Sequence, residues 1–311
     1  MPRSPRTLVC VIALLVVLAT ATFLYVRPET GPEPTPPGKP PAQAAGIVAP
    51  QTARLATTPA ETAAPEEPSE FVGFSADTPD IQLARVTALQ SNPNLAPEVL
   101  VFLSAVLADR SCEQTIRNNA ANALLNQPQP DPYLHRRFIA MIDDPTEEYE
   151  WREFAVQHLA VSHRTSAERE VIIDKLMRLV RDGDKGIPGT ALLHLHRLED
   201  DGAIALDDGY ADLLVSAIDD PSADLMTRMT AAGIAGERRE RRALPSLRLL
   251  ATTGIAALRR VSLAALGLIG EADDLAILRQ AATSDDPGVR AAASAAIVDA
   301  GSDSKEDLSD H

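Results

Sequence analysis

The chain has 311 residues, of which 45% are hydrophobic but only 4% are aromatic, and its net charge is -15. This charge argues against nonspecific binding of DNA or RNA, because phosphate recognition needs clustered lysine and arginine. The two cysteines, Cys10 and Cys112, leave no disulfide framework and no cysteine metal site within one chain. A sizeable core can be built from Ala, Leu, Val and Ile, whose small side chains suit closely stacked helices.

Residues 1–27 are predicted to form an uncleaved signal anchor. Leu8 to Val26 carries no charge, and as a helix it would be about 28 Å long, close to the hydrocarbon core of a bilayer at about 30 Å. Arg3 and Arg6 precede it, so the N-terminus should stay in the cytoplasm. A signal peptide cleaved near Ala19–Ala21 is the alternative. Both interpretations export the remainder, which predicts a single-pass bacterial inner-membrane protein whose C-terminal domain lies in the periplasm or outside the cell.

Residues 28–78 are predicted to be a disordered linker rich in Pro, Ala and Glu. Prolines recur from Pro28 to Pro68. Proline removes backbone donors, and few large apolar residues are present to be buried. We expect an extended spacer that holds the following domain away from the membrane.

A helical repeat is predicted over residues 79–301. Seven stretches share one template. An apolar residue comes first and is usually followed by Arg. After two further residues comes a small residue, and after three more comes Leu or another apolar or small residue. The stretches begin at Ile81-Gln82, Ile116-Arg117, Trp151-Arg152, Ile187-Pro188, Thr227-Arg228, Leu258-Arg259 and Val289-Arg290. Their second members lie 35, 35, 36, 40, 31 and 31 residues apart. Such a period is typical of an α-solenoid of stacked helix pairs. The predicted fold is therefore all-α, with about six to seven pairs.

The helices are delimited by capping residues, prolines and glycines. Ser166 and Asp207 can satisfy free N–H groups of a first turn, and Gly183 and Gly301 can end a helix. The expected pairs are 95–109 with 112–126, 132–143 with 147–162, 166–182 with 187–198, 208–219 with 222–236, 243–253 with 255–269, and 272–284 with 287–300. The helix at 80–91 is the second half of a leading partial repeat, and the acidic tail, residues 302–311, is expected to fray.

The repeat has a family resemblance at its C-terminal end. The segment Leu266–Leu278 runs on to Asp285–Arg290 and Ala291–Ile297. This resembles the short bacterial HEAT-like repeat, also called the phycobilisome-lyase-type repeat. Asp143-Asp144-Pro145 and Asp219-Asp220-Pro221 are similar to the same pattern with a longer loop. The resemblance covers about two-thirds of the chain and implies a fold, not an activity.

The arginine of each repeat lies beside the apolar stripe of the second helix of its pair. Its expected partner is the aspartate at the end of the preceding helix, where a carboxylate can cap a helix and also pair with a guanidinium. These aspartates are Asp109, Asp144, Asp220 and Asp286. The unit that holds Pro188 lacks the arginine and carries Gly186 and Gly189, which predicts irregular stacking and a bend.

Two histidines, His158 and His194, occupy the same position in consecutive second helices. Two imidazoles could ligate zinc, but no carboxylate holds a matching position, so buried, hydrogen-bonded histidines are favoured. Cys112 begins a helix, and a lone thiol there is expected to be inert. Because no motif of a hydrolase or nucleotide-binding enzyme occurs, the sequence predicts no enzyme activity, no catalytic residue, no metal and no cofactor. The resemblance leaves one alternative, a lyase-like accessory enzyme that handles a chromophore or cofactor.

Two further features were weighed as partner sites. The run Glu237–Arg242 is the one dense basic patch, and a solvated loop is favoured over contact with an acidic partner or lipid headgroups, because its glutamates offset part of the charge. Trp151 holds a core position of its repeat, so packing is favoured over a binding hot spot.

A partner is expected to bind on the concave face, which second helices line in such a solenoid. Positions +1, +2 and +5 from the arginine are left over from the buried stripe. The residues predicted to bind there, which we call the predicted strip, are Asn118, Asn119, Asn122, Phe154, Gln157, Leu193, Met229, Arg260 and Val261. The amides would bond the backbone of an extended peptide or partner helix, and the apolar residues would anchor its side chains. Alternatively, these residues only close a tight inner curve.

The predicted function is therefore a membrane-tethered, extracytoplasmic scaffold. It would recruit another protein or a peptide of the cell envelope, while the N-terminal helix would contact the membrane and no nucleic acid would be bound. A solute- or glycan-binding module would instead need a pocket lined by aromatic residues.

Overall fold

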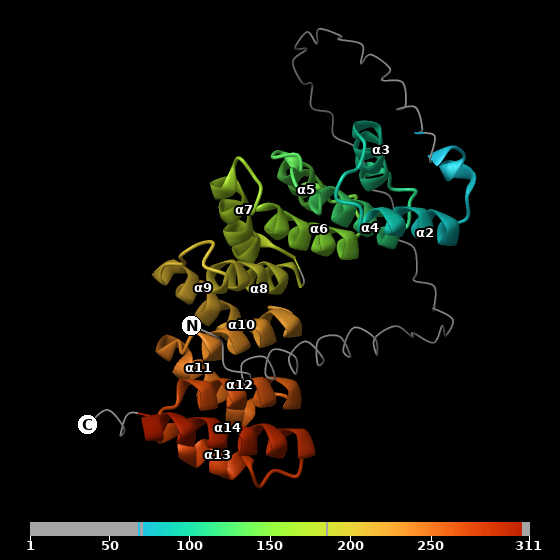
Figure 1. Cartoon of the computed structure of the whole chain (residues 1–311). Helices are drawn as coiled ribbons and strands as arrows, with labels where there is room; N and C mark the ends of the chain where they lie inside the picture. Colours follow the sequence, from blue (N-terminus) through green and yellow to red (C-terminus); the bar gives the residue numbers. More distant parts are fainter. Residues whose placement is uncertain (1–67, 69–70, 185, 307–311) are drawn as a thin grey trace, which may run out of the picture. The chain divides into compact units, whose positions relative to one another are not determined.

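The computed structural model describes residue 68 and residues 71–184 and 186–306. This part of the chain contains thirteen α-helices, three short 3-10 helices and no strand, which confirms the all-α prediction (Figure 1). The predicted anchor, residues 1–27, and most of the predicted linker lie outside the described residues. Among the residues described, no helix is both long and apolar enough to span a membrane.

The helices alternate between two kinds, as the repeat predicts. The first helices of the pairs are α3 (Pro97–Ala108), α5 (Leu134–Asp143), α7 (Arg169–Asp182), α9 (Asp208–Asp219), α11 (Leu244–Thr253) and α13 (Leu275–Ala281). The second helices are α4 (Gln114–Leu125), α6 (Tyr149–Ser162), α8 (Ile187–Asp200), α10 (Leu225–Glu237), α12 (Ala256–Ile269) and α14 (Pro287–Glu306), preceded by the unpaired α2 (Pro79–Leu89). The 3-10 helices are η2 (Phe74–Ala76), η3 (Arg241–Ala243) and η4 (Ala272–Asp274).

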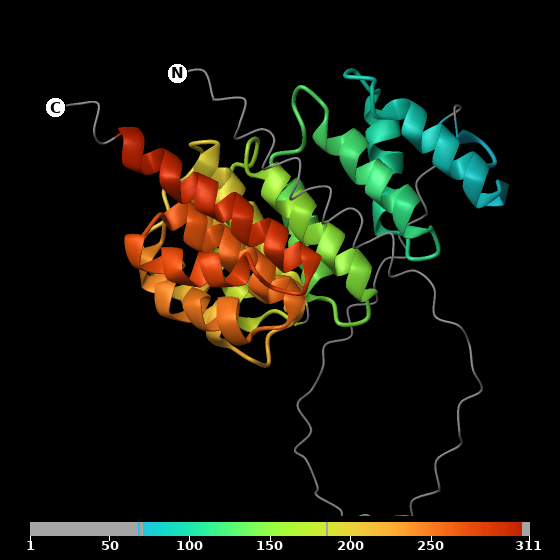
Figure 2. The ribbon, with the colours of Figure 1, turned by 90° about the horizontal axis from the view of Figure 1, so that it is seen from below.

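The helices α2, α4, α6, α8, α10, α12 and α14 pack one against the next, and from α4 on each also packs against the first helix of its own pair. Figure 2 shows the red α14 laid along the orange α12. Small and branched side chains fill the space between the helices, and Trp151 is completely buried there, as predicted. Because each pair covers the apolar face of its neighbour, this arrangement is an α-solenoid.

The unit that holds Pro188 packs on both neighbouring repeats, and the bend predicted there stays a prediction. Pro188 lies in the first turn of α8, where its missing N–H breaks no helical hydrogen bond. A Cβ on Gly189 would lie 2.9 Å from the Cα of Thr227 on α10. The glycine therefore permits close stacking, and α8 contacts both α6 and α10.

Two predicted boundaries are wrong. Phe71 and Phe74, assigned to the linker, are only 2% and 3% exposed, and their ring centroids lie 4.3 Å and 5.2 Å from that of Phe102 on α3. These rings cover the start of the solenoid, so the folded part includes residues before position 79. At the other end, α14 passes the predicted stop at Gly301 and continues to Glu306.

Candidate functional site

The nine residues of the predicted strip lie on the second helices α4, α6, α8, α10 and α12, and each is at least partly exposed. Phe154 is 36% exposed. Met229 and Val261 also pack against the core with part of their side chains. The structure thus places the strip at three positions that recur on consecutive second helices, and whether a partner binds there stays a prediction.

The amides of the strip already take part in contacts between repeats. Nδ2 of Asn119 donates a hydrogen bond to Oγ1 of Thr87 on α2, at 2.8 Å. Oδ1 of Asn118 lies 2.9 Å from Nε2 of His158 on α6. These polar atoms join α4 to its two neighbours, which weakens the expectation that they bond the backbone of a peptide.

Two further apolar side chains are exposed beside the strip, on α6 and α10. Val161 on α6 is 47% exposed, and Met226 on α10 is 37% exposed. Val161 follows Phe154 by seven residues and Met226 precedes Met229 by three, so each shares a helix face with a strip residue. This spacing was the sequence signal that could have found them.

The two equivalent histidines are buried, His158 at 5% and His194 at 9% exposure. Burial lowers the pKa of each to about 4, so both are neutral at neutral pH. The ring of His158 stacks on Phe138 with centroids 5.4 Å apart. Within the described ranges, no group of three or more His, Cys, Asp or Glu side chains is placed to hold a metal ion.

The repeat arginines do not pair with the aspartates that the sequence suggested. Nε of Arg117 donates to the carbonyl of Leu107 at 3.0 Å, and Nε of Arg152 donates to the carbonyl of Ile142 at 2.9 Å. Arg228 reaches the carbonyl of Ile218 in the same way. The last turn of a helix leaves carbonyls without intrahelical partners, and a basic side chain can satisfy them. The prediction of an arginine–aspartate ladder is therefore wrong.

The aspartates instead stabilise the turns that they begin. Oδ1 of Asp144 accepts a hydrogen bond from the backbone N–H of Thr146 at 2.9 Å, and Asp220 does the same with Ser222 at 2.8 Å. Hydrogen bonds from Thr146 and Ser222 hold the pKa of each carboxyl below its usual range. Short-range bonding to the backbone outcompetes pairing with the arginine because it needs no extended side chain.

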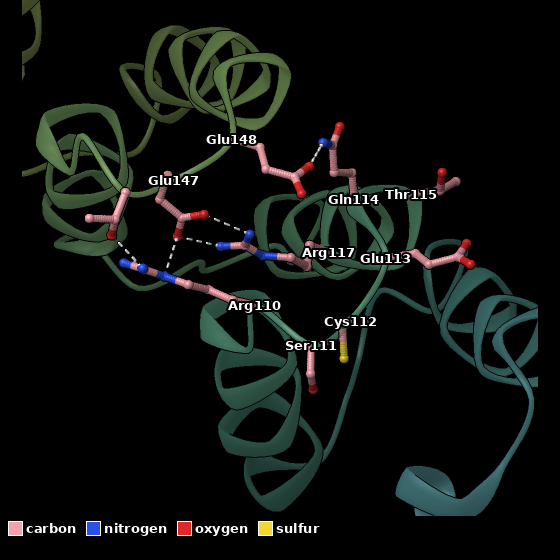
Figure 3. A pocket seen from close by; sticks show the side chains of 10 residues that line it. Arg110, Ser111, Cys112, Glu113, Gln114, Thr115, Arg117, Glu147 and Glu148 are labelled. Atoms are coloured by element: carbon pink, nitrogen blue, oxygen red, sulfur yellow. Dashed lines mark hydrogen bonds and ion pairs between the residues drawn. The ribbon is translucent and has the colours of Figure 1, made fainter. Parts of the chain in front are cut away.

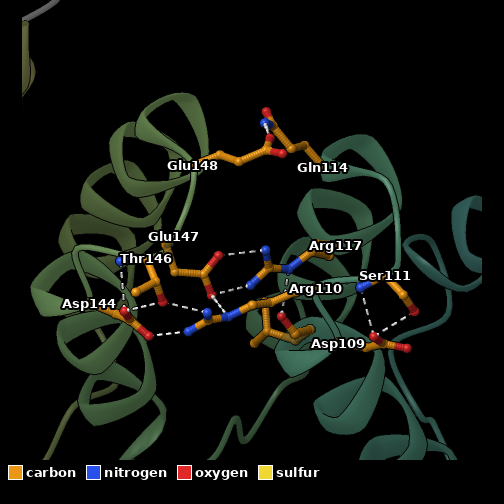
Figure 4. Close-up of polar contacts among 10 residues, drawn as sticks. Asp109, Arg110, Ser111, Gln114, Arg117, Asp144, Thr146, Glu147 and Glu148 are labelled. Atoms are coloured by element: carbon orange, nitrogen blue, oxygen red, sulfur yellow. Dashed lines mark hydrogen bonds and ion pairs between the residues drawn. The ribbon is translucent and has the colours of Figure 1, made fainter. Parts of the chain in front are cut away.

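A buried ion pair joins α4 to the α5–α6 loop, directly before α6. Both Nη atoms of Arg117 contact the carboxylate of Glu147, at 2.9 Å and 2.8 Å, and the two side chains are only 4% and 6% exposed (Figure 4). The guanidinium lies 4.2 Å from the ring centroid of Trp151. Arg110 reaches the same carboxylate and also pairs with Asp144. The sequence analysis missed Glu147, since nothing local indicates that an arginine reaches the following repeat.

A polar hollow of about 530 Å³ opens beside this ion pair, lined by the α3–α4 loop, the start of α4 and the α5–α6 loop (Figure 3). Cys112 contributes to its wall. Burial, together with Asp109, raises the pKa of the Cys112 thiol to about 11. The thiol is therefore protonated and weakly nucleophilic at neutral pH.

The basic run is not a free patch, and its charges are used between repeats. Arg238 pairs with Glu199, Arg241 with Glu271 at 2.8 Å, and Arg242 with Asp212 at 2.9 Å. Glu237 also contacts Nε2 of His196 on α8 at 2.9 Å. The run is solvent-exposed at Glu237, Arg239, Arg241 and Arg242, in agreement with the favoured loop, and its ion pairs join neighbouring repeats; contact with an acidic partner or lipid headgroups stays untested.

One cluster escaped the sequence analysis altogether. Oγ of Ser166 lies 3.1 Å from Nδ1 of His135, whose Nε2 lies 2.9 Å from Oε2 of Glu168. The residue types are those of a Ser–His–acid triad, but the two ring nitrogens are reversed, because in that triad the serine faces Nε2 and the acid faces Nδ1. His135 is fully buried, and Oγ of Ser166 also accepts the backbone N–H of Glu168 at 2.9 Å. The contacts fasten α5 to the start of α7.

Comparison with known proteins agrees with this architecture. A family model described as HEAT repeats matches residues 211–298. This match covers α10, α11, α12 and α13 with parts of α9 and α14, so these repeats resemble HEAT repeats. No curated protein matches it. Among solved structures, human deoxyhypusine hydroxylase in complex with glycerol is similar at 17% identity, with 75% of this chain and 83% of that chain covered and a TM-score of 0.35.

The prediction of no enzyme activity is corrected by this last comparison. The similar structure is itself an enzyme. At this identity and TM-score, neither its reaction nor its site residues are carried over to this HEAT-like protein.

Proposed function

We propose that this HEAT-like protein is a scaffold that binds a partner protein or peptide on the exposed face of its second helices. The observation that carries the proposal is a row of partly exposed apolar side chains on consecutive second helices, which we call the apolar strip. It consists of Phe154, Val161, Leu193, Met229 and Val261. Stacked repeats present the same helix face side by side, so one partner segment can be anchored at several points.

Binding is centred on α6 to α12 in this proposal. The asparagines on α4 have polar atoms engaged with Thr87 and His158, whereas the apolar strip leaves part of each side chain in water. Covering apolar surface with a partner is favourable by about 25 cal/mol per Å² before the costs of association. The apolar half therefore has more binding free energy to offer than the amide half.

The setting that we propose is the envelope of a bacterial cell. The charge-free run from Leu8 to Val26 supports a membrane anchor, and the prolines between Pro28 and Pro68 support a spacer. The scaffold would then stand outside the cytoplasmic membrane and recruit an envelope protein. Carbonate extraction of membranes and protease accessibility of the full chain in spheroplasts test this setting, which is rejected if the protein is extracted or if its C-terminal domain is shielded from protease added to spheroplasts.

The binding face is tested by site-directed photocrosslinking. A benzophenone amino acid is placed at Phe154 or at Leu193, and as a matched control at Leu249 on α11, which is 60% exposed but lies on a first helix. We expect a discrete crosslinked product from the two strip positions and none from Leu249. Equal products from all three positions, or none from the strip, would contradict the proposal.

A further inference from the structure

Three glycines of the second helices are required by close packing. A Cβ on Gly189 would lie 2.9 Å from the Cα of Thr227, one on Gly236 would lie 2.6 Å from the Cα of Ala265, and one on Gly267 would lie 2.6 Å from the Cα of Ala296. Each of these positions faces the backbone of the following second helix. A side chain there would push two helices apart.

Gly233 lies on the same kind of helix but has no such constraint. Among the described residues, apart from the chain neighbours and the backbone of α10 itself, a Cβ at this position would meet only Cγ2 of Val261, at 3.8 Å, which is ordinary van der Waals contact. Its backbone is helical, in the interior of α10. A glycine in a helix interior costs about 0.5–1 kcal/mol relative to alanine. Folding therefore gains nothing from a glycine at position 233.

The surroundings of Gly233 are apolar on one side and cationic on the other. Met226 and Met229 share its face of α10, and Val261 faces it from α12. Arg260 is exposed, and within the described part of the chain it makes no ion pair or hydrogen bond, although its charge acts on Asp286.

Arg260 lies on the side of Val261 that faces α14. Its Nη1 would be 2.8 Å from a Cβ on Gly288, at the start of α14. Gly233, Val261 and Arg260 therefore follow one another from α10 across α12 towards α14. The exposed guanidinium of Arg260, which has no ion pair among the described residues, can receive a carboxylate of the partner in two parallel hydrogen bonds.

We propose that the space over Gly233 receives a bulky apolar side chain of an acidic amphipathic peptide segment, and that a carboxylate of this segment pairs with Arg260. The inference rests on the proposed scaffold function and names the chemistry of its partner. The missing side chain supplies room for the anchor, Met226 and Met229 adapt to its shape, and the arginine fixes the orientation of the segment.

Three synthetic helical peptides serve as probes in fluorescence anisotropy: one with leucines and glutamates, one with leucines and lysines, and one with serines and glutamates. We expect the first to bind best. Gly233→Leu should weaken this binding by about tenfold or more, because the anchor loses its space. Arg260→Ala should weaken the leucine–glutamate peptide and leave the leucine–lysine peptide unchanged.

Unfolding in urea separates a lost site from a lost fold. Gly233→Ala should raise the unfolding midpoint while it weakens binding, and Ala140→Leu, on the exposed face of α5, should leave binding unchanged. Unchanged binding by Gly233→Leu, or equal binding of the acidic and basic peptides, would overturn the inference. If crosslinking from Phe154 succeeds in that case, the scaffold stands and only this site fails. If crosslinking and peptide binding both fail, both proposals fail.

Discussion

Two seams of the solenoid are built in opposite ways. Between α4 and α6 the contact is polar, with the buried pair of Arg117 and Glu147 and the hydrogen bond from His158 to Asn118. Between α10, α12 and α14 the helices touch through Gly236 and Gly267, and the helices contact each other more extensively there than α4 and α6 do. The same repeat template thus supports either directional bonds or close backbone packing.

The two seams should lose stability through different changes: loss of a charge in the first, and added side-chain volume in the second. A buried ion pair fixes how two repeats align. When one partner is removed, the other charge stays buried without compensation, which lowers the free energy of unfolding. A seam of small residues gains its stability from dispersion over many atoms and tolerates no added volume. Charge and pH should therefore act on the first seam, and steric bulk on the second.

The largest effect is expected when the ion pair is broken. Glu147→Ala leaves the guanidinium of Arg117 buried without its partner, and we expect a loss of about 3–5 kcal/mol in the free energy of unfolding. Urea denaturation followed by circular dichroism measures it. Arg117→Met combined with Glu147→Leu should recover most of the loss.

A surface pair is the matched control for this experiment. Arg241 pairs with Glu271, but its side chain is 77% exposed, so Arg241→Ala should cost no more than about 1 kcal/mol. Equal losses for Glu147→Ala and Arg241→Ala would show that the seam does not depend on its buried charge.

Acid should weaken α6 and α8 before α12 and α14. The pKa of His158 and of His194 is about 4 in the folded protein and 6.5 for a free histidine. Between these values the unfolded chain binds more protons, so stability falls as the pH falls from about 6.5 to about 4, by up to about 3 kcal/mol per histidine. Hydrogen exchange resolved by helix measures the difference.

The histidine substitutions make this prediction specific. His158→Gln and His194→Gln should flatten the pH dependence of stability in this range. The explanation fails if the double variant keeps the full loss, or if α12 and α14 open at the same pH as α6.

Added bulk should act on the other seam. Gly267→Ala places a Cβ 2.6 Å from the Cα of Ala296, and we expect a loss of about 1–3 kcal/mol as α12 and α14 separate. Gly233→Ala is the control in the same set of helices, with an expected gain of up to about 1 kcal/mol. A similar effect of both substitutions on the unfolding midpoint would remove the steric distinction.

The smallest effect is expected at the amide end of the predicted strip. Asn119→Ala removes the hydrogen bond to Thr87, which should cost about 1 kcal/mol of stability. Binding of the leucine–glutamate peptide should stay unchanged, because this asparagine joins α4 to α2. A clear loss of peptide affinity without a loss of stability would show that Asn119 contributes to peptide binding.

Local sequence signals predicted the repeat better than the contacts within it. The 31- to 40-residue spacing gave the helix pairs, and the buried Trp151 followed from its place in the template. The partners of Arg117 did not follow, because its guanidinium contacts Leu107, ten residues earlier, and Glu147, thirty residues later. Likewise, no local pattern joins His135 to Ser166 and Glu168.

By itself the sequence determined the all-α class, the number of repeats and the helix faces that must be buried, because apolar periodicity and helix-end residues act within a few turns of chain. Only the tertiary structure decided which charges pair, which amides are already bonded, and which glycines are needed for packing. Those properties depend on how closely neighbouring repeats approach, and that distance is set by the side chains of two helices together.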